Sequence, residues 1–595
     1  MTQFLDIGTL ANGYASGAFT PADIIREIQA RIAERGIRPT WITLVPADQA
    51  FAKAKAAAKG PLYGIPFAVK DNIDVAGLPT TCACPEFAYT PPRSAMVVER
   101  LEAAGAILIG KTNMDQFATG LVGTRTPYGI PSSVFNPEYV SGGSSSGSAV
   151  AVASGLVSFA LGTDTAGSGR VPAAFNNIVG LKPTKGLIST RGVVPACRTQ
   201  DAVSIFGLTV ADAARVLEVA AGFDAEDPYS RPAALANSNA GALSGMRVGI
   251  PSEQLEFFGD AEAERLHGKA VAGVSALGAK LVEIDFAPFR EVAALLYSGP
   301  WVAERYAAIM PFIENHPEAV HDVVRGITLG GGKLTAVAAF EGLYRLAELT
   351  RKAEAEWRKM DTLLLPTTGT TYKIAELLAD PVRLNSNLGA YTNFVNLMDL
   401  SALAVPAGFR QNGLPFGITF IGRTFEDARL QDIADNIHRH LPGAKLGGTT
   451  QDLGQTAAVK PLAGTTIQVA VVGAHLSGQP LNKQLTDRSA RLIETTRTAK
   501  GYRLFALANT SPPKPGLVFD GQAAGCIEVE IWELDLAAFG SFVALIPAPL
   551  GIGTLKLIDG RTVKGFICEP YAVEGAKDIT SSGGWRAWLA LQPDC

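Results

Sequence analysis

The stretch "SGGSSSGSAVAVASGLVSFALGTDTAGSGR", residues 141–170, decides the fold of this chain. Its apolar middle, residues 149–162, is too short for a membrane span, which needs roughly 18 residues. It therefore predicts a buried helix that runs into a buried strand. Glycine and serine crowd both ends of this run. The pattern leaves open whether one of these serines does covalent chemistry or lies in a flexible loop.

Outside this stretch, the pattern of the chain changes once, near residue 440. Before that point helices alternate with apolar strands, which predicts one large α/β domain over residues 1–440. Residues 441–464 are rich in Gly, Thr and Ala and are typical of a linker. Residues 465–595 hold short strands, and one of them, "CIEVEIWELD", alternates apolar residues with glutamates. We therefore expect a second, mostly β domain there.

Composition and charge exclude several classes of partner. The 595 residues carry a net charge of −4, so no basic excess indicates binding to nucleic acid or to an anionic membrane. We expect a small-molecule substrate and other copies of the chain as partners. The first residues lack the basic and apolar regions of a signal peptide, which predicts a cytoplasmic protein. Among the six cysteines only Cys82 and Cys84 are close, a weak metal motif, so we expect reduced thiols, no metal and no cofactor.

Two familiar motifs occur in unsuitable places. "GAILIGKT", residues 105–112, matches the phosphate-binding loop, but the residues between its glycines predict a strand, and Lys111 is expected to end it. "GSSSG", residues 143–147, matches a nucleophile elbow centred on Ser145. That elbow needs a preceding strand and a histidine partner, and the sequence offers neither in a suitable place. We expect Ser145 or Ser146 to cap the helix that follows.

A lysine offers the base that a serine nucleophile needs. Lys70 follows the apolar run "YGIPFAV", where burial would favour its neutral amine. An ion pair with Asp71 or Asp74 would account for the same position. The glycine-rich loop at residues 162–184 has successive N–H groups that suit an oxyanion, with Ser168 among them. Taken alone, it is equally consistent with a structural turn.

Three blocks of sequence together resemble the amidase signature family over residues 1–440. They are "KDNIDVAG" with Lys70, "GGSSSGSAVAVASG" with Ser144 and "GTDTAGSGRVPAAFNNIVGLKPTKG" with Ser168. The resemblance implies an α/β fold in which helices surround a mixed central sheet. It also implies that Ser168 is the nucleophile, that Lys70 is the terminal base and that Ser144, after a cis peptide bond, relays the proton. The implied oxyanion hole is formed by the N–H groups of Thr165, Ala166, Gly167 and Ser168. The chain departs from the commonest family text at Ser146, Ala166 and Gly169, and none of these changes removes a triad atom.

The rest of the chain resembles one branch of that family, which carries an additional C-terminal domain. The blocks are "TGLVGTRTPYG", "LLYSGPWVAERY" and "VVGAHLSGQPLNKQL". This branch hydrolyses a small urea derivative that bears a carboxylate, for which a guanidinium is the best partner. The resemblance implies Arg305 as that cation, Tyr297 as a hydroxyl partner and Gly123 as a point of close backbone approach. A surface ion pair of Arg305 with Glu304 or with another neighbouring residue is the alternative.

The C-terminal domain resembles the γ-glutamylcyclotransferase-like β-barrels. His475 follows the strand "QVAVVG", where an imidazole can act as acid or base near neutral pH. We expect it to assist decarboxylation of the first product, and the alternative is a structural histidine in a domain that serves assembly. For the whole chain, the alternatives are an amidase for another small or aryl amide and an inactive amidase with a binding module. The family resemblance also implies a homodimer.

Overall fold

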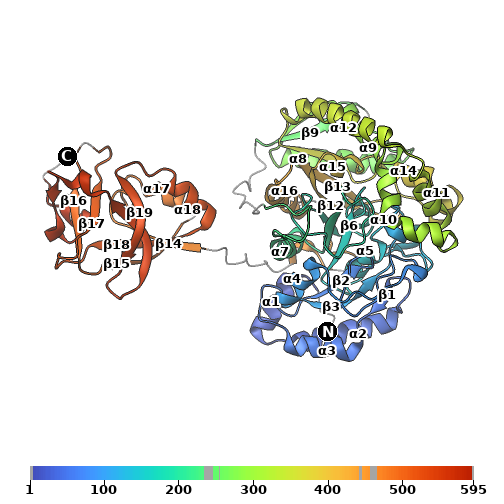
Figure 1. Cartoon of the computed structure of the whole chain (residues 1–595), viewed down its shortest axis with the longest axis horizontal. Helices are drawn as coiled ribbons and strands as arrows, with labels where there is room; N and C mark the ends of the chain where they lie inside the picture. The colour runs from blue at the N-terminus through green and yellow to red at the C-terminus, as the bar shows by residue number, and fades with distance from the viewer. Residues whose placement is uncertain are drawn as a thin grey trace. The chain divides into compact units, whose positions relative to one another are not determined.

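The computed structural model describes residues 5–232, 245–253, 255–440, 445–449, 451–455, 466–488, 490–508 and 510–592. The chain divides into two units, Met1–Lys460 and Pro461–Cys595 (Figure 1). Much of the predicted linker, at residues 441–444, 450 and 456–464, lies outside the described residues. The remainder contacts the first unit, because the N–H groups of Gly447 and Gly448 donate to Asn177 and Ala153. The predicted domain boundaries, 440 and 465, stay predictions.

The first unit is built on one mixed sheet. Among the described residues its eleven strands run, from edge to edge, β1 (Trp41–Leu44), β3 (Ile107–Thr112), β2 (Pro66–Lys70), β6 (Phe159–Asp164), β8 (Ala202–Gly207), β7 (Val179–Lys182), β12 (Ser401–Phe409), β13 (Pro415–Gly422), β11 (Thr362–Pro366), β9 (Arg247–Pro251) and β10 (Lys280–Ile284). Strand β2 pairs in parallel with β3 and β6, whereas β6 pairs antiparallel with β8. This confirms the predicted α/β class with a mixed central sheet.

Helices surround this sheet (Figure 1). Those of the first unit are α1 (Ile7–Ser16), α2 (Pro21–Arg35), α3 (Ala47–Ala56), α4 (Met96–Ala103), α5 (Ser146–Ala153), α6 (Val171–Phe175), α7 (Val210–Ala220), α8 (Ala261–Ala276), α9 (Ala287–Ser298), α10 (Trp301–Asn315), α11 (Asp322–Gly331), α12 (Ala336–Trp357), α13 (Ile374–Ala379), α14 (Arg383–Leu388), α15 (Phe394–Leu397) and α16 (Asp427–His440). In the described residues no helix is both long and apolar enough to cross a membrane.

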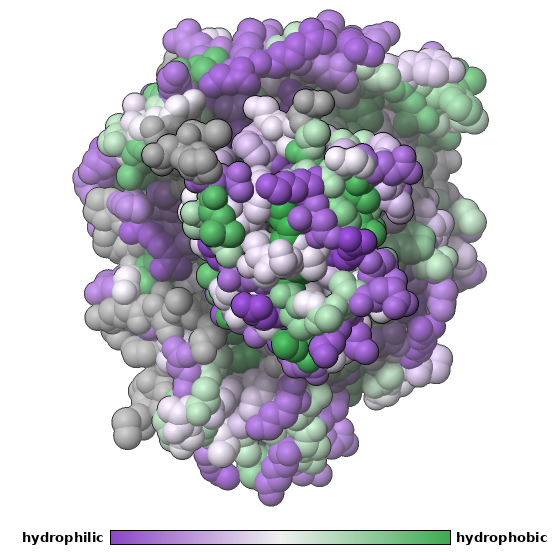
Figure 2. All heavy atoms as spheres, turned by 90° about the vertical axis from the view of Figure 1, so that its left-hand side faces the viewer, coloured by the Kyte–Doolittle hydropathy of each residue, from purple (hydrophilic) through white to green (hydrophobic). Residues whose placement is uncertain are grey.

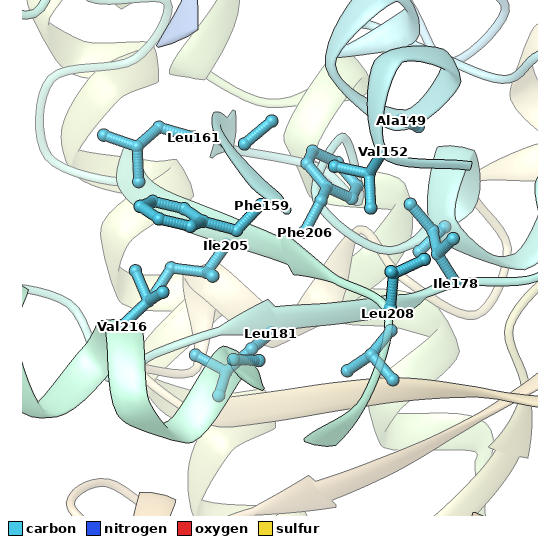
Figure 3. Close-up of a cluster of buried hydrophobic side chains, with 14 of the residues drawn as sticks. Ala149, Val152, Phe159, Leu161, Ile178, Leu181, Ile205, Phe206, Leu208 and Val216 are labelled. Carbon is cyan, nitrogen blue, oxygen red and sulfur yellow. The ribbon is translucent and has the colours of Figure 1, made fainter. Parts of the chain in front are cut away.

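The quoted stretch at residues 141–170 supplies the centre of the core. Helix α5 is buried along its whole length, and so is β6, which confirms the predicted buried helix and strand. Figure 3 shows side chains of α5, β6, β7, β8 and α7 meeting in one apolar cluster, where Phe159 and Phe206 are fully buried. Because β2 and β6 are neighbouring parallel strands, their carboxyl ends meet at the same edge of the sheet. Lys70 and Asp164 stand at these two ends.

The second unit is mostly β, as predicted. A five-stranded sheet has the order β15 (Arg491–Arg497), β18 (Glu528–Asp535), β14 (Thr466–Val471), β20 (Thr562–Cys568) and β19 (Leu550–Lys556), beside a smaller sheet of β17 (Pro515–Phe519), β16 (Tyr502–Ala506) and β21 (Lys577–Asp578). Its helices are α17 (Lys483–Thr486), α18 (Leu536–Val543) and α19 (Trp585–Leu589). The face of the protein drawn in Figure 2 intersperses hydrophilic residues with smaller hydrophobic areas.

One strand of the second unit differs from the simple alternation in its sequence. Val529 and Ile531 of β18 are buried, as the pattern predicts, but Glu530 between them is buried too. Its carboxylate accepts hydrogen bonds from the Arg586 guanidinium and from the backbone N–H and hydroxyl of Ser477. The alternating pattern of β18 alone would place Glu530 in solvent. The ion pair with Arg586 instead stabilises its charge inside the protein.

Candidate active site

A continuous chain of polar atoms joins the two Gly- and Ser-rich loops to the end of β2. The Lys70 ammonium donates hydrogen bonds to Ser144 Oγ at 2.8 Å and to Thr163 Oγ1 at 2.8 Å. Ser144 Oγ donates to Ser168 Oγ at 2.9 Å. Lys70 and Ser144 are fully buried and Ser168 is 3% exposed. The structure therefore brings together the three residues that the sequence proposes as nucleophile, relay and base.

Burial changes the protonation of Lys70. Desolvation lowers the pKa of its amine to about 7, although the carboxylates of Asp115, Asp201 and Asp164 oppose this effect. The alternative pairing with Asp71 is wrong, because Asp71 Oδ1 lies 3.3 Å from Lys111 Nζ instead. In the described residues no ion pair joins Lys70 to any carboxylate. Near neutral pH a large share of Lys70 is therefore neutral and can accept a proton.

The motif that resembles a phosphate-binding loop, residues 105–112, ends near Lys111, the partner of Asp71 in this ion pair. Residues 107–112 form the buried strand β3, as predicted, and Lys111 Nζ also donates to the Pro79 carbonyl and the Thr80 hydroxyl. Its ammonium is held inside the protein by Asp71, Pro79 and Thr80. Among the described residues, no group of three or more His, Cys, Asp or Glu side chains stands close enough to hold a metal ion.

The loop before α5 holds Ser144 and two further serines. The Gly143–Ser144 peptide bond is cis. Ser145 occupies the N-cap position of α5, but the prediction of a side-chain cap is wrong, because its hydroxyl makes no such bond. Ser145 Oγ instead donates to the Thr163 carbonyl, and Ser146 Oγ donates to the Asn113 carbonyl. These hydroxyls tie the loop to β6 and to the residue after β3.

A buried carboxylate shapes the loop around Ser168. Arg170 donates from Nε and Nη2 to the two oxygens of Asp164, at 2.9 and 3.0 Å. Burial alone would raise the pKa of Asp164, but the Arg170 charge and these hydrogen bonds hold it below its usual range. Asp164 also accepts the N–H groups of Gly167 and Gly169. It therefore stays ionised and fixes the backbone on both sides of Ser168.

This arrangement changes the expected set of oxyanion donors. Because the Gly167 N–H donates to Asp164, it does not point freely at a substrate. Within the described residues, the N–H groups of Thr165, Ala166 and Ser168 have no hydrogen-bond partner. The Thr165 hydroxyl donates to Asp201, which also accepts the N–H groups of Ala196 and Cys197. These hydrogen bonds connect the loop around Ser168 to the chain at residues 196–201.

Gly169 departs from the commonest family text for a steric reason. A Cβ at this position would stand 2.4 Å from Ser204 Cβ and 2.6 Å from Ser204 Oγ. The neighbouring strand β8 therefore occupies the space that a larger residue needs. Gly167 has φ of +135°, a backbone conformation that L side chains rarely adopt, and faces the Thr392 side chain.

Arg305 lies on α10 and forms the second part of the site. Its side chain is 3% exposed, and Nη1 donates to Thr119 Oγ1 at 3.1 Å. The guanidinium lies 5.3 Å from the ring centroid of Tyr297 at the end of α9. Nε and Nη2 have no hydrogen-bond partner in the part of the chain that the structure describes. Arg170 binds both oxygens of Asp164 through the same two atoms, Nε and Nη2. Arg305 can therefore bind a carboxylate through the same two-donor fork.

The alternative partner for Arg305 is excluded. The Glu304 carboxylate accepts hydrogen bonds from the backbone N–H and the hydroxyl of Thr199, and among the described residues it forms no ion pair with Arg305. Arg305 also lies close to Ser168, because its partner Thr119 precedes Gly120, whose carbonyl is 3.4 Å from Ser168 Oγ. Arg305 and the Ser168 hydroxyl thus contact the same short backbone segment, residues 119–120.

Gly123 lies beside the relay loop. Its φ is +78°, its N–H donates to Asp115 Oδ2 at 3.0 Å, and a Cβ there would stand 2.8 Å from the Gly142 carbonyl. The glycine therefore allows close packing against the loop that carries Ser144. Its approach to a substrate stays a prediction.

Sequence reasoning did not single out four residues that complete the site. Thr163 and Asp164 lie inside the quoted glycine-rich block. They are polar residues at the end of a buried strand, and this position could have indicated that they belong to the site. Arg170 and Thr119 had no local signal, since their partners are known only from the folded chain.

A separate cavity surrounds His475 in the second unit. Its volume is about 250 Å³, and Gln484, Lys514 and Phe566 are among the residues that line it. The imidazole stacks on Phe566 at 5.0 Å, and its Nε2 lies 2.9 Å from Gln484 Oε1. Burial lowers the pKa of His475, the Gln484 hydrogen bond opposes this, and the Lys514 charge adds to the lowering. A mainly neutral imidazole thus shares a cavity with one cation.

Comparison with known proteins agrees with this geometry. Residues 25–430 match the family described as Amidase, and residues 467–590 match the allophanate hydrolase C-terminal domain. The urea amidolyase of Saccharomyces cerevisiae is 44% identical over 592 residues, which cover 95% of this chain and 32% of that protein. The allophanate hydrolase structure from Kluyveromyces lactis is 41% identical with a TM-score of 0.80, and covers 99% of this chain and 100% of that one. A glutamyl-tRNA(Gln) amidotransferase subunit from Symbiobacterium thermophilum is 38% identical over 71% of this chain and 93% of that protein. The chain therefore belongs to the amidase family, and it carries an allophanate hydrolase C-terminal domain.

Proposed function

We propose that this chain is an allophanate hydrolase that removes the terminal amide of allophanate. The observation that carries the proposal is the Lys70–Ser144–Ser168 chain of polar atoms beside the unpaired guanidinium fork of Arg305. The similarity to the Kluyveromyces lactis protein, over the whole of both chains, supports it. The chain spans about a third of the length of the urea amidolyases that it matches, so the activity of those longer proteins is not carried over as a whole.

The first half of the reaction forms an acyl-enzyme. Neutral Lys70 accepts the Ser144 hydroxyl proton while Ser144 accepts the proton of Ser168. With a protonated lysine the hydrogen bonds run the other way, from Lys70 to Ser144 and from Ser144 to Ser168. Ser168 Oγ attacks the terminal carbonyl carbon, and the free N–H groups of Thr165, Ala166 and Ser168 stabilise the oxyanion. The C–N bond then breaks, the relayed proton passes to the departing nitrogen and ammonia leaves.

Water completes the reaction along the same path. Lys70 takes a proton from water through Ser144, the hydroxide attacks the acyl carbon and Ser168 recovers its proton as the ester bond breaks. The product is N-carboxycarbamate. Thr163 Oγ1 holds one N–H of the amine through both halves, which leaves the lone pair directed at Ser144.

Arg305 provides the specificity for a carboxylated amide. Its Nε and Nη2 can donate two parallel hydrogen bonds to the substrate carboxylate, and the Tyr297 ring covers the guanidinium from one side. A neutral amide would leave these buried donors unpaired, which is unfavourable. We expect Arg305→Gln to raise the KM for allophanate far more than for biuret, its neutral amide analogue.

For the second unit, we propose that His475 assists decarboxylation of N-carboxycarbamate. The cavity offers the Lys514 cation to a carboxylate and a mainly neutral imidazole as proton carrier. In His475→Ala the first ammonia should appear at the normal rate while release of carbon dioxide is delayed. His440→Ala is the matched control, because His440 is exposed on α16 of the first unit. Equal rates of carbon dioxide release in both variants would favour a structural second unit.

The central experiment counts ammonia and carbon dioxide from allophanate and from a panel of neutral amides. We expect both products from the wild type and no ammonia from Ser168→Ala. Ser145→Ala is the matched control and should keep most of the activity, because its hydroxyl only ties the loop to β6. No turnover of allophanate, with good turnover of a neutral amide, would favour the alternative amidase. The homodimer and the cytoplasmic location stay predictions, and light scattering of the purified chain tests the first.

A further inference from the structure

A second buried guanidinium lies in the same part of the first unit as Arg305. Arg125 follows Gly123 in the block "GLVGTRTPYG" and is 1% exposed. Its Nη1 donates to the Thr119 carbonyl at 2.9 Å and its Nη2 donates to the Pro381 carbonyl at 2.8 Å. Its Nε has no hydrogen-bond partner within the described residues. Both partners of Arg125 are neutral.

Thr119 is therefore held from two sides by the two arginines. Arg125 binds its carbonyl, while Arg305 binds its hydroxyl. The next carbonyl, that of Gly120, lies against Ser168 Oγ. A shift of Arg125 would therefore move Thr119 and Gly120. Through these two residues it would also move Arg305 and Ser168.

Two buried guanidinium groups lie near Thr119 without a direct ion pair. In the described residues neither Arg125 nor Arg305 forms an ion pair, whereas the buried Arg170 is fully paired with Asp164. Burial lowers the pKa of Arg125, the Asp115 carboxylate and Tyr297 oppose this, and the charge of Arg305 lowers it further. The Asp115 oxygens are already held by the N–H groups of Val122, Gly123 and Arg125. Arg125 and Arg305 therefore lie close enough for their charges to repel each other, while the Asp201 and Glu304 carboxylates offset part of the charge of Arg305.

We propose that Arg125 is a positioning and specificity-determining residue of this site. Through Thr119 it aligns Arg305 with Ser168, and its charge makes an anionic amide a far better ligand than a neutral one. An anion relieves the repulsion between the two guanidinium groups, whereas a neutral amide leaves it in place. The proposal rests on the proposed function, because it assumes that the substrate carboxylate lies at Arg305.

A purely structural role makes a different prediction. If Arg125 only ties residues 119–125 to the chain before α14, its loss displaces Ser168 and slows charged and neutral substrates alike. If its charge also selects the substrate, its loss weakens the carboxylated substrate selectively and mainly through KM. The ratio of the two kcat/KM values separates these cases.

The experiment compares Arg125→Gln, Arg125→Lys and wild type on allophanate and on biuret. Removing one buried charge near the ligand should lower the allophanate-to-biuret ratio of kcat/KM by roughly tenfold or more in Arg125→Gln. Arg125→Lys, which keeps the charge, should keep the ratio within about threefold of wild type even where both rates fall. Arg265→Gln, which removes an exposed arginine paired with Glu262 on α8, is the control. An unchanged ratio in Arg125→Gln, or an equal fall of the ratio in Arg125→Lys, would overturn the proposal.

A binding measurement separates this proposal from the proposed function. Calorimetry on the same full-length variants measures the affinity for malonate, a dicarboxylate, and for malonamide, its neutral diamide. We expect Arg125→Gln to weaken malonate binding and to leave the weak affinity for malonamide little changed. If wild type does not hydrolyse allophanate but Arg125→Gln still loses malonate selectively, the proposed function fails and the role of Arg125 stands. Equal loss of both ligands would overturn the role of Arg125 alone.

Discussion

The sharpest prediction concerns the protonation of Lys70. A lysine with an ordinary pKa of about 10.5 would be neutral in fewer than roughly one molecule in a thousand at pH 7, whereas burial brings this pKa to about 7 and makes about half of the molecules neutral. Because the proposed mechanism uses the neutral amine as the base, kcat/KM should fall about tenfold for each pH unit below about 7 and should level off above it. The assay is initial-rate ammonia release with the wild-type chain across this range.

A second buried lysine provides the control. Burial also lowers the pKa of Lys182 to about 7, but among the described residues its ammonium donates only to the carbonyls of Pro183 and Leu400, not to the Ser144 and Ser168 hydroxyls. Lys182→Met should therefore keep the acid limb near pH 7, at whatever level of activity the variant retains. The reasoning would be refuted by a profile that is flat below pH 7 in the wild type. It would equally be refuted by an acid limb that disappears in Lys182→Met.

The remaining predictions test particular contacts. Thr163→Val removes one hydrogen bond to the base and should lower kcat about tenfold with little change in KM, as measured by steady-state kinetics. Gly169→Ala places a Cβ against Ser204 and should reduce the free energy of unfolding by about 1–3 kcal/mol in urea titrations, and Ser204→Gly in the same chain should restore part of it. Lys111→Met leaves Asp71 buried without its cation and should reduce that free energy by about 3–5 kcal/mol, and a loss below about 1 kcal/mol would contradict the buried pair.

Local patterns predicted a large part of the fold. Helix α2 begins at Pro21 after the Thr20 cap and ends before Gly36, because capping residues and the first-turn proline act within a few positions. The apolar runs of β2, β3 and β6 are fully buried strands, as continuous hydrophobic runs predict.

The reactive residues could be proposed from sequence, but their chemistry could not. Lys70, Ser144 and Ser168 were identified by resemblance to the family. Their hydrogen bonds, the pKa of Lys70 and the use of the Gly167 N–H by Asp164 depend on which groups surround them in space.

The sequence by itself determined the α/β class and the change to a β-rich second part, and it proposed Lys70, Ser144 and Ser168 as the reactive residues. Tertiary structure alone decided the partners of the buried charges. Lys70 and Asp71 are adjacent in the chain, yet Asp71 pairs with Lys111. Arg305 meets Thr119 from 186 positions away and Arg125 meets Pro381 from 256 positions away. Secondary-structure propensity and hydrophobic periodicity depend on a few neighbouring residues. A buried charge instead pairs with a polar group that the packing of distant strands and loops places next to it.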